Sequence, residues 1–187
     1  MPRRNLHLSF NVELMNLFIG MTRGVAGLPR DLAQLGYITR CIEFRFANGA
    51  GDQVHPELIL SSGRLGHSLL LEWKSGPNTE EDQLRRYAGV TADSLRANAF
   101  LRVEECRQHD ITVVGRAEHE ERIAIGVERF NFVLLTRTDE GLRRVRNAFA
   151  VPELNEVINP VLAVDWSLVP CGFFPVDDSS ELWEFAQ

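Results

Sequence analysis

Glu57, Glu72 and Lys74 are the residues whose types and spacing best fit catalytic chemistry. Glu72 and Lys74 lie two positions apart at the end of an apolar run, so on a strand both side chains leave the same face. Burying a carboxylate and an ammonium beside a sheet core is unfavourable unless they are paired or bind a metal. Glu57 begins the preceding predicted strand, and hairpin pairing of the two strands would bring it alongside Glu72.

Two carboxylates held close together repel each other, and a divalent cation relieves that repulsion. Carboxylate oxygens are ligands that suit Mg²⁺ or Mn²⁺. Such an ion can lower the pKa of a water molecule and neutralise charge on a phosphate. Lys74 would then orient or deprotonate the attacking water, or hold the phosphate.

The order of these residues resembles the motif of the PD-(D/E)XK nuclease superfamily. Pro56-Glu57 is followed, after fourteen residues, by Glu72-Trp73-Lys74. Gln83 and Tyr87 match a Gln-x-x-x-Tyr element that is found in a large subset of the superfamily, the RecB-like nucleases among them. The resemblance covers roughly residues 30–115, and Glu57 stands where the family usually has Asp.

This resemblance implies a restriction-endonuclease-like core: a helix, three antiparallel strands, a helix and a further strand. It implies Mg²⁺- or Mn²⁺-dependent hydrolysis of phosphodiester bonds. Glu57, Glu72 and the backbone carbonyl of Trp73 would hold the metal, and Lys74 would complete the catalytic set. The longer arm of Glu57 still allows ligation but would shift the metal.

Four residues of the helix after the third strand are expected to bind substrate. Gln83 and Tyr87 are four apart, so they share one helical face, and Arg85 and Arg86 supply a local basic patch. Three acidic residues outside the motif are further candidates for the site. They are Glu13 and Asp31 in the N-terminal helices and Glu43 on the first strand, and a solvent-facing carboxylate is the favoured interpretation of each.

Hydrophobic periodicity predicts an α/β fold with a central mixed β-sheet flanked by helices. The domain is expected to span residues 1–187, with a core at about 30–150 and a C-terminal extension at 151–187 that could lead into a further domain. The expected helices lie near residues 12–18, at 29–35, 79–97 and 139–149, and a last one begins near 179. The expected strands span residues 38–46, 56–60, 68–74, 111–114, 122–127 and 131–136.

Composition, net charge and cysteine spacing limit the classes of function that fit this chain. With 44% hydrophobic and 25% charged residues among 187, the chain has the composition of a globular domain. Its net charge of -6 argues against a protein that coats nucleic acid, so DNA contacts must come from local basic patches. Three widely spaced cysteines suggest neither a zinc ribbon nor a disulfide framework.

The sequence therefore predicts a metal-dependent DNA nuclease, in defence, restriction, repair or mobile-element processing. A catalytically inactive nuclease fold that binds nucleic acid or a partner protein is the alternative, and an RNA nuclease is a third. No apolar run is long enough to span a membrane, and a cytoplasmic protein is expected. Cutting both strands of DNA would favour a homodimer or a larger complex.

Overall fold

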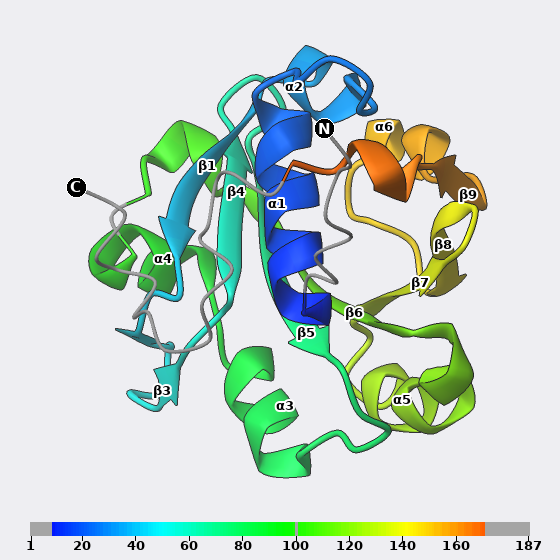
Figure 1. Cartoon of the computed structure of the whole chain (residues 1–187). Helices are drawn as coiled ribbons and strands as arrows, with labels where there is room; N and C mark the ends of the chain where they lie inside the picture. The colour runs from blue at the N-terminus through cyan, green and yellow to red at the C-terminus, as the bar shows by residue number, and fades with distance from the viewer. Residues whose placement is uncertain (1–8, 100, 171–187) are drawn as a thin grey trace.

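A curled, mixed β-sheet forms the centre of the molecule. Across residues 9–99 and 101–170, which a computed structural model describes, the sheet has seven strands in the order β1-β4-β5-β6-β7-β8-β9, and β2 and β3 form a separate pair. Helices cover both faces of the sheet (Figure 1). The predicted α/β class, with a central mixed sheet flanked by helices, is confirmed.

The bounds of the elements follow the chain. The strands are β1 (Tyr37–Ile42), β2 (Phe46–Ala47), β3 (Gln53–Val54), β4 (Leu58–Ser62), β5 (His67–Lys74), β6 (Gln108–Arg116), β7 (Val133–Thr138), β8 (Gly141–Arg146) and β9 (Val161–Ala163). The α-helices are α1 (Phe10–Thr22), α2 (Asp31–Gln34), α3 (Glu81–Ala88), α4 (Ala92–Asn98), α5 (Glu120–Glu128) and α6 (Pro152–Val157). Short 3₁₀ turns lie at Val103–Glu105, Ala117–His119 and Trp166–Leu168.

Strand pairing divides the sheet into two antiparallel halves. β1, β4 and β5 pair antiparallel, with Leu58 opposite Leu71, and β7, β8 and β9 form the second half. β6 joins the halves and runs parallel to both β5 and β7. The chain reaches β6 from β5 through α3 and α4, because a parallel neighbour requires a crossover. Over residues 30–115 the elements run α2, β1, β2, β3, β4, β5, α3, α4 and β6, so the short β2–β3 pair and the division of the helix are added to the expected order.

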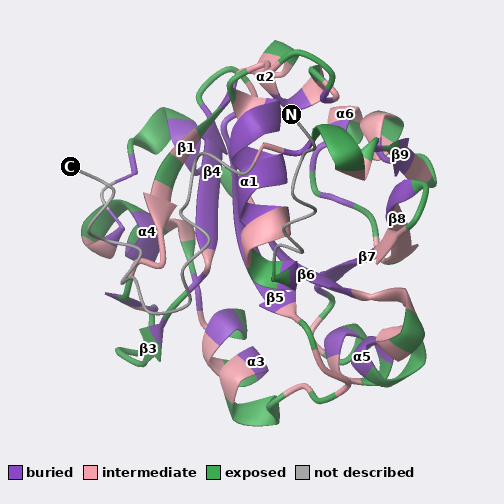
Figure 2. Ribbon diagram, in the orientation of Figure 1, coloured by how far each residue is buried: buried purple, intermediate pink, exposed green. Residues whose placement is uncertain are grey.

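The alternation of side chains along β5 separates two cores. Leu69, Leu71 and Trp73 pack on one face with α1, and Trp73 stacks on Phe18 with ring centroids 5.5 Å apart. Leu70 packs on the other face with residues of α3, α4 and α5. β4 and β5 are buried along almost their whole length (Figure 2), and burial on both faces explains why their apolar residues, Leu58–Leu60 and Leu69–Leu71, are consecutive rather than alternating.

Two predicted elements are wrong. Residues 122–127 form part of helix α5 and not a strand, because Ile123 and Val127 are four apart and both bury on one helical face. Residues 139–149 were expected to be a helix, but they contain the turn of the β7–β8 hairpin and strand β8. Arg143 and Arg144 therefore lie on a strand.

Smaller differences concern boundaries. The helix expected over 79–97 is divided at residues 89–91 into α3 and α4. The strand expected over 38–46 ends at Ile42, and Phe46 begins β2. β9 pairs with β8, so the sheet extends past the expected core limit at residue 150. The helix expected near 179 lies outside the described residues.

Two further observations bear on the sequence expectations. In the described part of the chain, no helix has both the length and the apolarity to cross a membrane. Cys41 and Cys106 are free thiols, and Cys171 lies outside the described residues.

Candidate active site

A cluster of four polar side chains lies where β5 meets α3. Tyr87 donates a hydrogen bond of 2.7 Å to Oε2 of Glu72, and Gln83 Nε2 donates one of 2.8 Å to Oε1. Lys74 Nζ lies 3.1 Å from the same Oε1 and donates a bond of 2.5 Å to Gln83 Oε1. The structure thus brings together four of the residues that the sequence nominated.

Strand and helix geometry place these groups. Glu72 and Lys74 leave the face of β5 that α3 covers, because they alternate with the apolar residues of the opposite face. Gln83 and Tyr87 are one helical turn apart and share the face of α3 that looks at β5. Leu84 and Tyr87 are the buried residues of α3, so the contact that packs the helix also positions the polar groups.

The buried carboxylate of Glu72 is stabilised by its donors. The residue is 4% exposed, and a buried carboxylate needs charged or hydrogen-bonding partners. Lys74 supplies a positive charge, while Gln83 and Tyr87 supply neutral donors. Burial, followed by the negative charge of Glu72, raises the pKa of Tyr87 far above its usual value, so its phenol keeps its proton and remains a donor.

Glu57 stands directly before β4, beside this cluster. Its amide donates to the carbonyl of Leu71 at 3.0 Å, which keeps the segment alongside β5 next to Glu72. Burial, and then the charges of Glu72 and Glu43, raise the pKa of Glu57 to about 7, while Lys74 opposes the shift. Extending the β4–β5 register by one residue, from Leu58 opposite Leu71, places Glu57 opposite Glu72 on the same face of the sheet.

Glu43 lies beside Glu57 along the backbone and is half-buried, where the sequence favoured a solvent-facing carboxylate. It directly follows β1, its amide donates to the carbonyl of Glu57 at 2.9 Å, and its φ of 46° is unusual for a residue with a side chain. Burial raises the pKa of Glu43, and His55 opposes the shift. Strand alternation does not predict the position of Glu43, because the backbone turns after Ile42, where β1 ends.

The site offers oxygen ligands for a divalent cation. Glu57 and Glu72 supply two carboxylates. Trp73 lies two residues after Leu71 on the same strand, so its carbonyl is expected to point to the same flank as the Leu71 carbonyl, toward Glu57. Within residues 9–99 and 101–170, no three His, Cys, Asp or Glu side chains form a ready-made metal site. An ion here would need the carbonyl, water or substrate oxygens beside the two carboxylates.

Of the other candidate residues, Arg85, Glu13 and Asp31 lie apart from this cluster. Arg85 points outward on α3 and pairs with Glu81 and Asp82, whereas Arg86 is half-buried. Glu13 is bound to Arg137 of β7 at 2.9 Å. Asp31 belongs to α2, next to the start of β1, whereas Glu43 follows the end of that strand.

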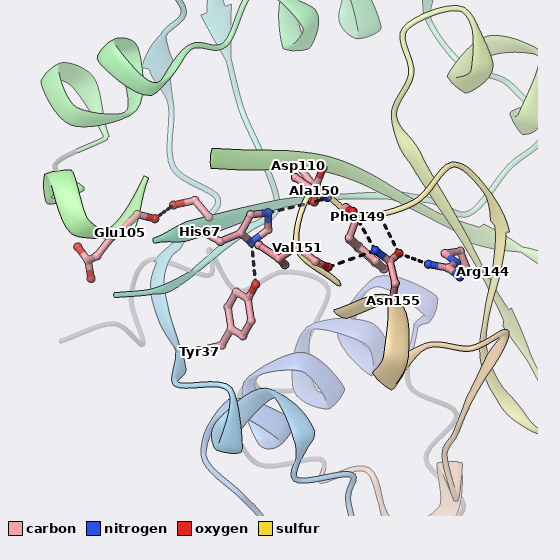
Figure 3. A network of polar contacts seen from close by, with 10 residues as sticks. Tyr37, His67, Glu105, Asp110, Arg144, Phe149, Ala150, Val151 and Asn155 are labelled. Carbon is pink, nitrogen blue, oxygen red and sulfur yellow. Dashed lines mark hydrogen bonds and ion pairs between the residues drawn. The ribbon is translucent and has the colours of Figure 1, made fainter. Parts of the chain in front are cut away.

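A second polar network crosses the opposite end of β5. Tyr37 and His67 Nδ1 are 2.7 Å apart, and His67 Nε2 lies 3.0 Å from Asp110, which also accepts from the Ala150 amide at 2.8 Å (Figure 3). Tyr37 and His67 are buried. The contacts tie β1, β5 and β6 to the segment before α6, which is a structural role.

The fold and the site define an α/β domain with a carboxylate-lysine cluster on the central sheet. Residues 11–166 match the family model of the MJECL32 domain, and the chain belongs to this family. No curated protein and no solved structure matches the chain. The family's name states no chemistry, so the function is argued from the site.

Proposed function

We propose that this protein is a metal-dependent nuclease of the PD-(D/E)XK type that hydrolyses phosphodiester bonds of DNA. The observation that carries the proposal is the contact of Lys74 and Gln83 with Glu72, in a carboxylate cluster that includes Glu57. Residues from β5, α3 and the start of β4 meet there in the combination that the sequence motif implies.

Each residue has a role that follows from its surroundings. Glu57 and Glu72, with the Trp73 carbonyl, would hold a Mg²⁺ or Mn²⁺ ion, which when bound polarises phosphate oxygens and makes water more acidic. Lys74 would orient the attacking water or stabilise charge that develops on the phosphate. Gln83 and Tyr87 would fix the orientation of Glu72 and Lys74, as outer-shell groups commonly do for metal ligands.

An inactive nuclease fold that binds DNA or a partner protein is the second candidate. It is favoured by the saturation of Glu72, whose two oxygens already receive three contacts. The net charge of -6 also limits contact with nucleic acid. In that case the hydrogen bonds and the ion pair of the cluster would serve only to hold α3 against β5.

Metal binding and DNA cleavage distinguish the two candidates. Purified protein would be incubated with plasmid, linear and single-stranded DNA in Mg²⁺, Mn²⁺ or EDTA, and Mn²⁺ binding would be measured by calorimetry. We expect cleavage with either metal and none in EDTA, with Mn²⁺ binding lost in Glu72→Gln. Glu128→Gln, which removes an exposed carboxylate of α5, is the control and should bind Mn²⁺ as the wild type does. Absence of both cleavage and Mn²⁺ binding in the wild type would favour the inactive fold.

A further inference from the structure

A cleft lies between α3 and the β2–β3 hairpin, next to the carboxylates. Its volume is about 420 Å³, and its lining residues are Arg45, Gln53, Val54, His55 and Arg86. The hairpin and α3 lie at the same end of the molecule (Figure 1).

The chain connects this cleft directly to the carboxylate cluster. Arg45 is two residues from Glu43, and His55 is two residues from Glu57. His55 Nε2 also lies 2.8 Å from the carbonyl of Glu43. Two residues of extended chain span about 7 Å. Arg45 and His55 therefore lie within about that distance, along the backbone, of Glu43 and Glu57.

Hydrogen bonds from the Asn48 side chain and the Gly49 amide hold the walls of the cleft in place. Asn48, which is buried, donates to the carbonyl of Arg86 at 2.7 Å, and the Gly49 amide donates to the carbonyl of Gly89 at 2.9 Å. Oδ1 of Asn48 accepts from the amides of Ala50 and Asp52. The hairpin is thereby fixed to the C-terminal end of α3, which holds the two walls of the cleft relative to each other.

Charge sets this cleft apart from its neighbours. Among the described residues, neither Arg45 nor Arg86 has an acidic partner, whereas Arg129, in the cleft between α3 and α5, pairs with Glu81. A third cleft, of about 590 Å³, is lined by Glu118, Glu120 and Glu121 as well as by basic residues. In a protein of net charge -6, unpaired guanidinium groups facing a cleft create a local site for an anion.

We infer that this cleft binds a phosphate of the DNA backbone adjoining the phosphate that meets Glu57 and Glu72. The inference rests on the proposed function, which places a DNA strand at the carboxylates. Guanidinium groups form paired, charge-assisted hydrogen bonds with phosphate oxygens, and Gln53 and His55 add polar groups. Contacts of this kind position DNA without reading its sequence.

DNA binding in EDTA tests the inference without requiring cleavage. A fluorescein-labelled DNA duplex would be titrated with wild type, Arg45→Ala/Arg86→Ala and Arg64→Ala/Arg96→Ala at several salt concentrations, with anisotropy as the readout. Arg64 and Arg96 are arginines outside the cleft, so their double variant controls for net charge. We expect the cleft variant to bind at least about tenfold more weakly. Its slope of log K against log salt should fall by about 0.9 for each lost phosphate contact, and the control should keep the wild-type slope.

The outcomes separate this inference from the nuclease proposal. Equal affinity and slope in the cleft variant and the control, or no binding of DNA by the wild type, would overturn the inference. Loss of binding in the cleft variant, together with a wild type that cannot cut DNA in Mn²⁺, would leave the cleft as a DNA site and end the nuclease proposal. If the double variant fails to fold, Arg45→Glu at this exposed position replaces it and should weaken binding further.

Discussion

The hydroxyl of Tyr87 donates a hydrogen bond of 2.7 Å to Oε2 of Glu72, which lies 15 residues earlier in the chain. The bond joins helix α3 to the centre of the sheet, and both partners are buried. It leaves Oε1 of the same carboxylate to Gln83 and Lys74. One side chain of α3 therefore holds the carboxylate in the orientation in which the lysine meets it.

Replacing Tyr87 with Phe should lower the free energy of unfolding and also weaken Mn²⁺ binding at the site. The change leaves a buried carboxylate oxygen without its donor, which typically costs about 1–3 kcal/mol of unfolding free energy. Urea unfolding would measure this loss, and calorimetry would show weaker Mn²⁺ binding. Tyr37→Phe is the matched control, since it removes a buried hydroxyl next to His67 at the other end of β5. Equal effects of the two variants on Mn²⁺ binding would contradict a role of Tyr87 at the site.

Replacing Lys74 with Ala should abolish cleavage with a small effect on stability. Loss of one group that stabilises developing charge typically lowers the rate about a hundredfold or more. Glu72 keeps two donors in the variant, Gln83 and Tyr87, so the melting temperature should change little. Plasmid cleavage in Mn²⁺ and thermal unfolding would be compared with Arg64→Ala. Cleavage at the wild-type rate would remove Lys74 from the mechanism, and global unfolding would instead identify it as a structural ion-pair partner.

The raised pKa of Glu57 predicts opposite pH trends for stability and metal binding. Its folded-state pKa of about 7 exceeds the ordinary value of 4.5, so between these values the folded protein holds a proton that the unfolded chain has released. Stability in EDTA should therefore fall as the pH rises from about 5 to about 7. Mn²⁺ affinity should rise over the same interval, because the ion requires the ionised carboxylate.

Glu57→Gln is the variant that checks this assignment. Urea unfolding in EDTA and Mn²⁺ calorimetry, each at several pH values, should lose most of their pH dependence in this interval. Glu128→Gln should keep the wild-type trends. Unchanged trends in Glu57→Gln would assign the titration to another group, with Glu43 the next to be replaced.

A side chain added at Gly126 on α5 is predicted to displace the loop between β5 and α3. A Cβ atom at Gly126 would overlap the hydroxyl of Thr79, whereas one at Gly76, in the same loop, would meet nothing within 4 Å. Gly126→Ala should therefore displace the start of α3 and destabilise the protein by about 1–3 kcal/mol. Gly76→Ala should be neutral in urea unfolding, and equal stability of the two variants would show that the loop adjusts freely.

The part of the site that lies on one strand and one helix could be predicted from the sequence. The positions of Glu72 and Lys74 follow from strand alternation, and those of Gln83 and Tyr87 follow from the helical turn. These signals are local. Because the loop between β5 and α3 is short, the strand pair and the helix pair lie close together. The contacts among the four residues agree with this expectation, while their catalytic roles stay predictions.

The rest depended on tertiary structure. Glu43 lies beside Glu57 because the backbone turns after Ile42, and no periodicity in the sequence predicts that turn. The segment 122–127 is short, and its apolar residues Ile123 and Val127 lie four positions apart. That spacing fits one face of a helix and also one face of a strand, so the pattern alone could not separate the alternatives. The error at residues 139–149 has a different source: Asp139 and Glu140 are the turn of a hairpin, and Gly141 takes a φ of 145° that a helix would not use.

The position of β6 between two antiparallel halves has a consequence for how the chain folds. Hairpin contacts such as those of β4 with β5 and β7 with β8 are close in sequence and can form early. Pairing of β6 with β5 must wait until the segment that contains α3 and α4 has closed, which carries a larger loop entropy. The two halves of the sheet should therefore form before they join, and amide exchange measured during refolding should show protection in β6 after protection in the hairpins. Glu57, Glu72 and Lys74 all belong to the first half, but Gln83 and Tyr87 reach them with the crossover, so the site is completed in the same step that joins the sheet.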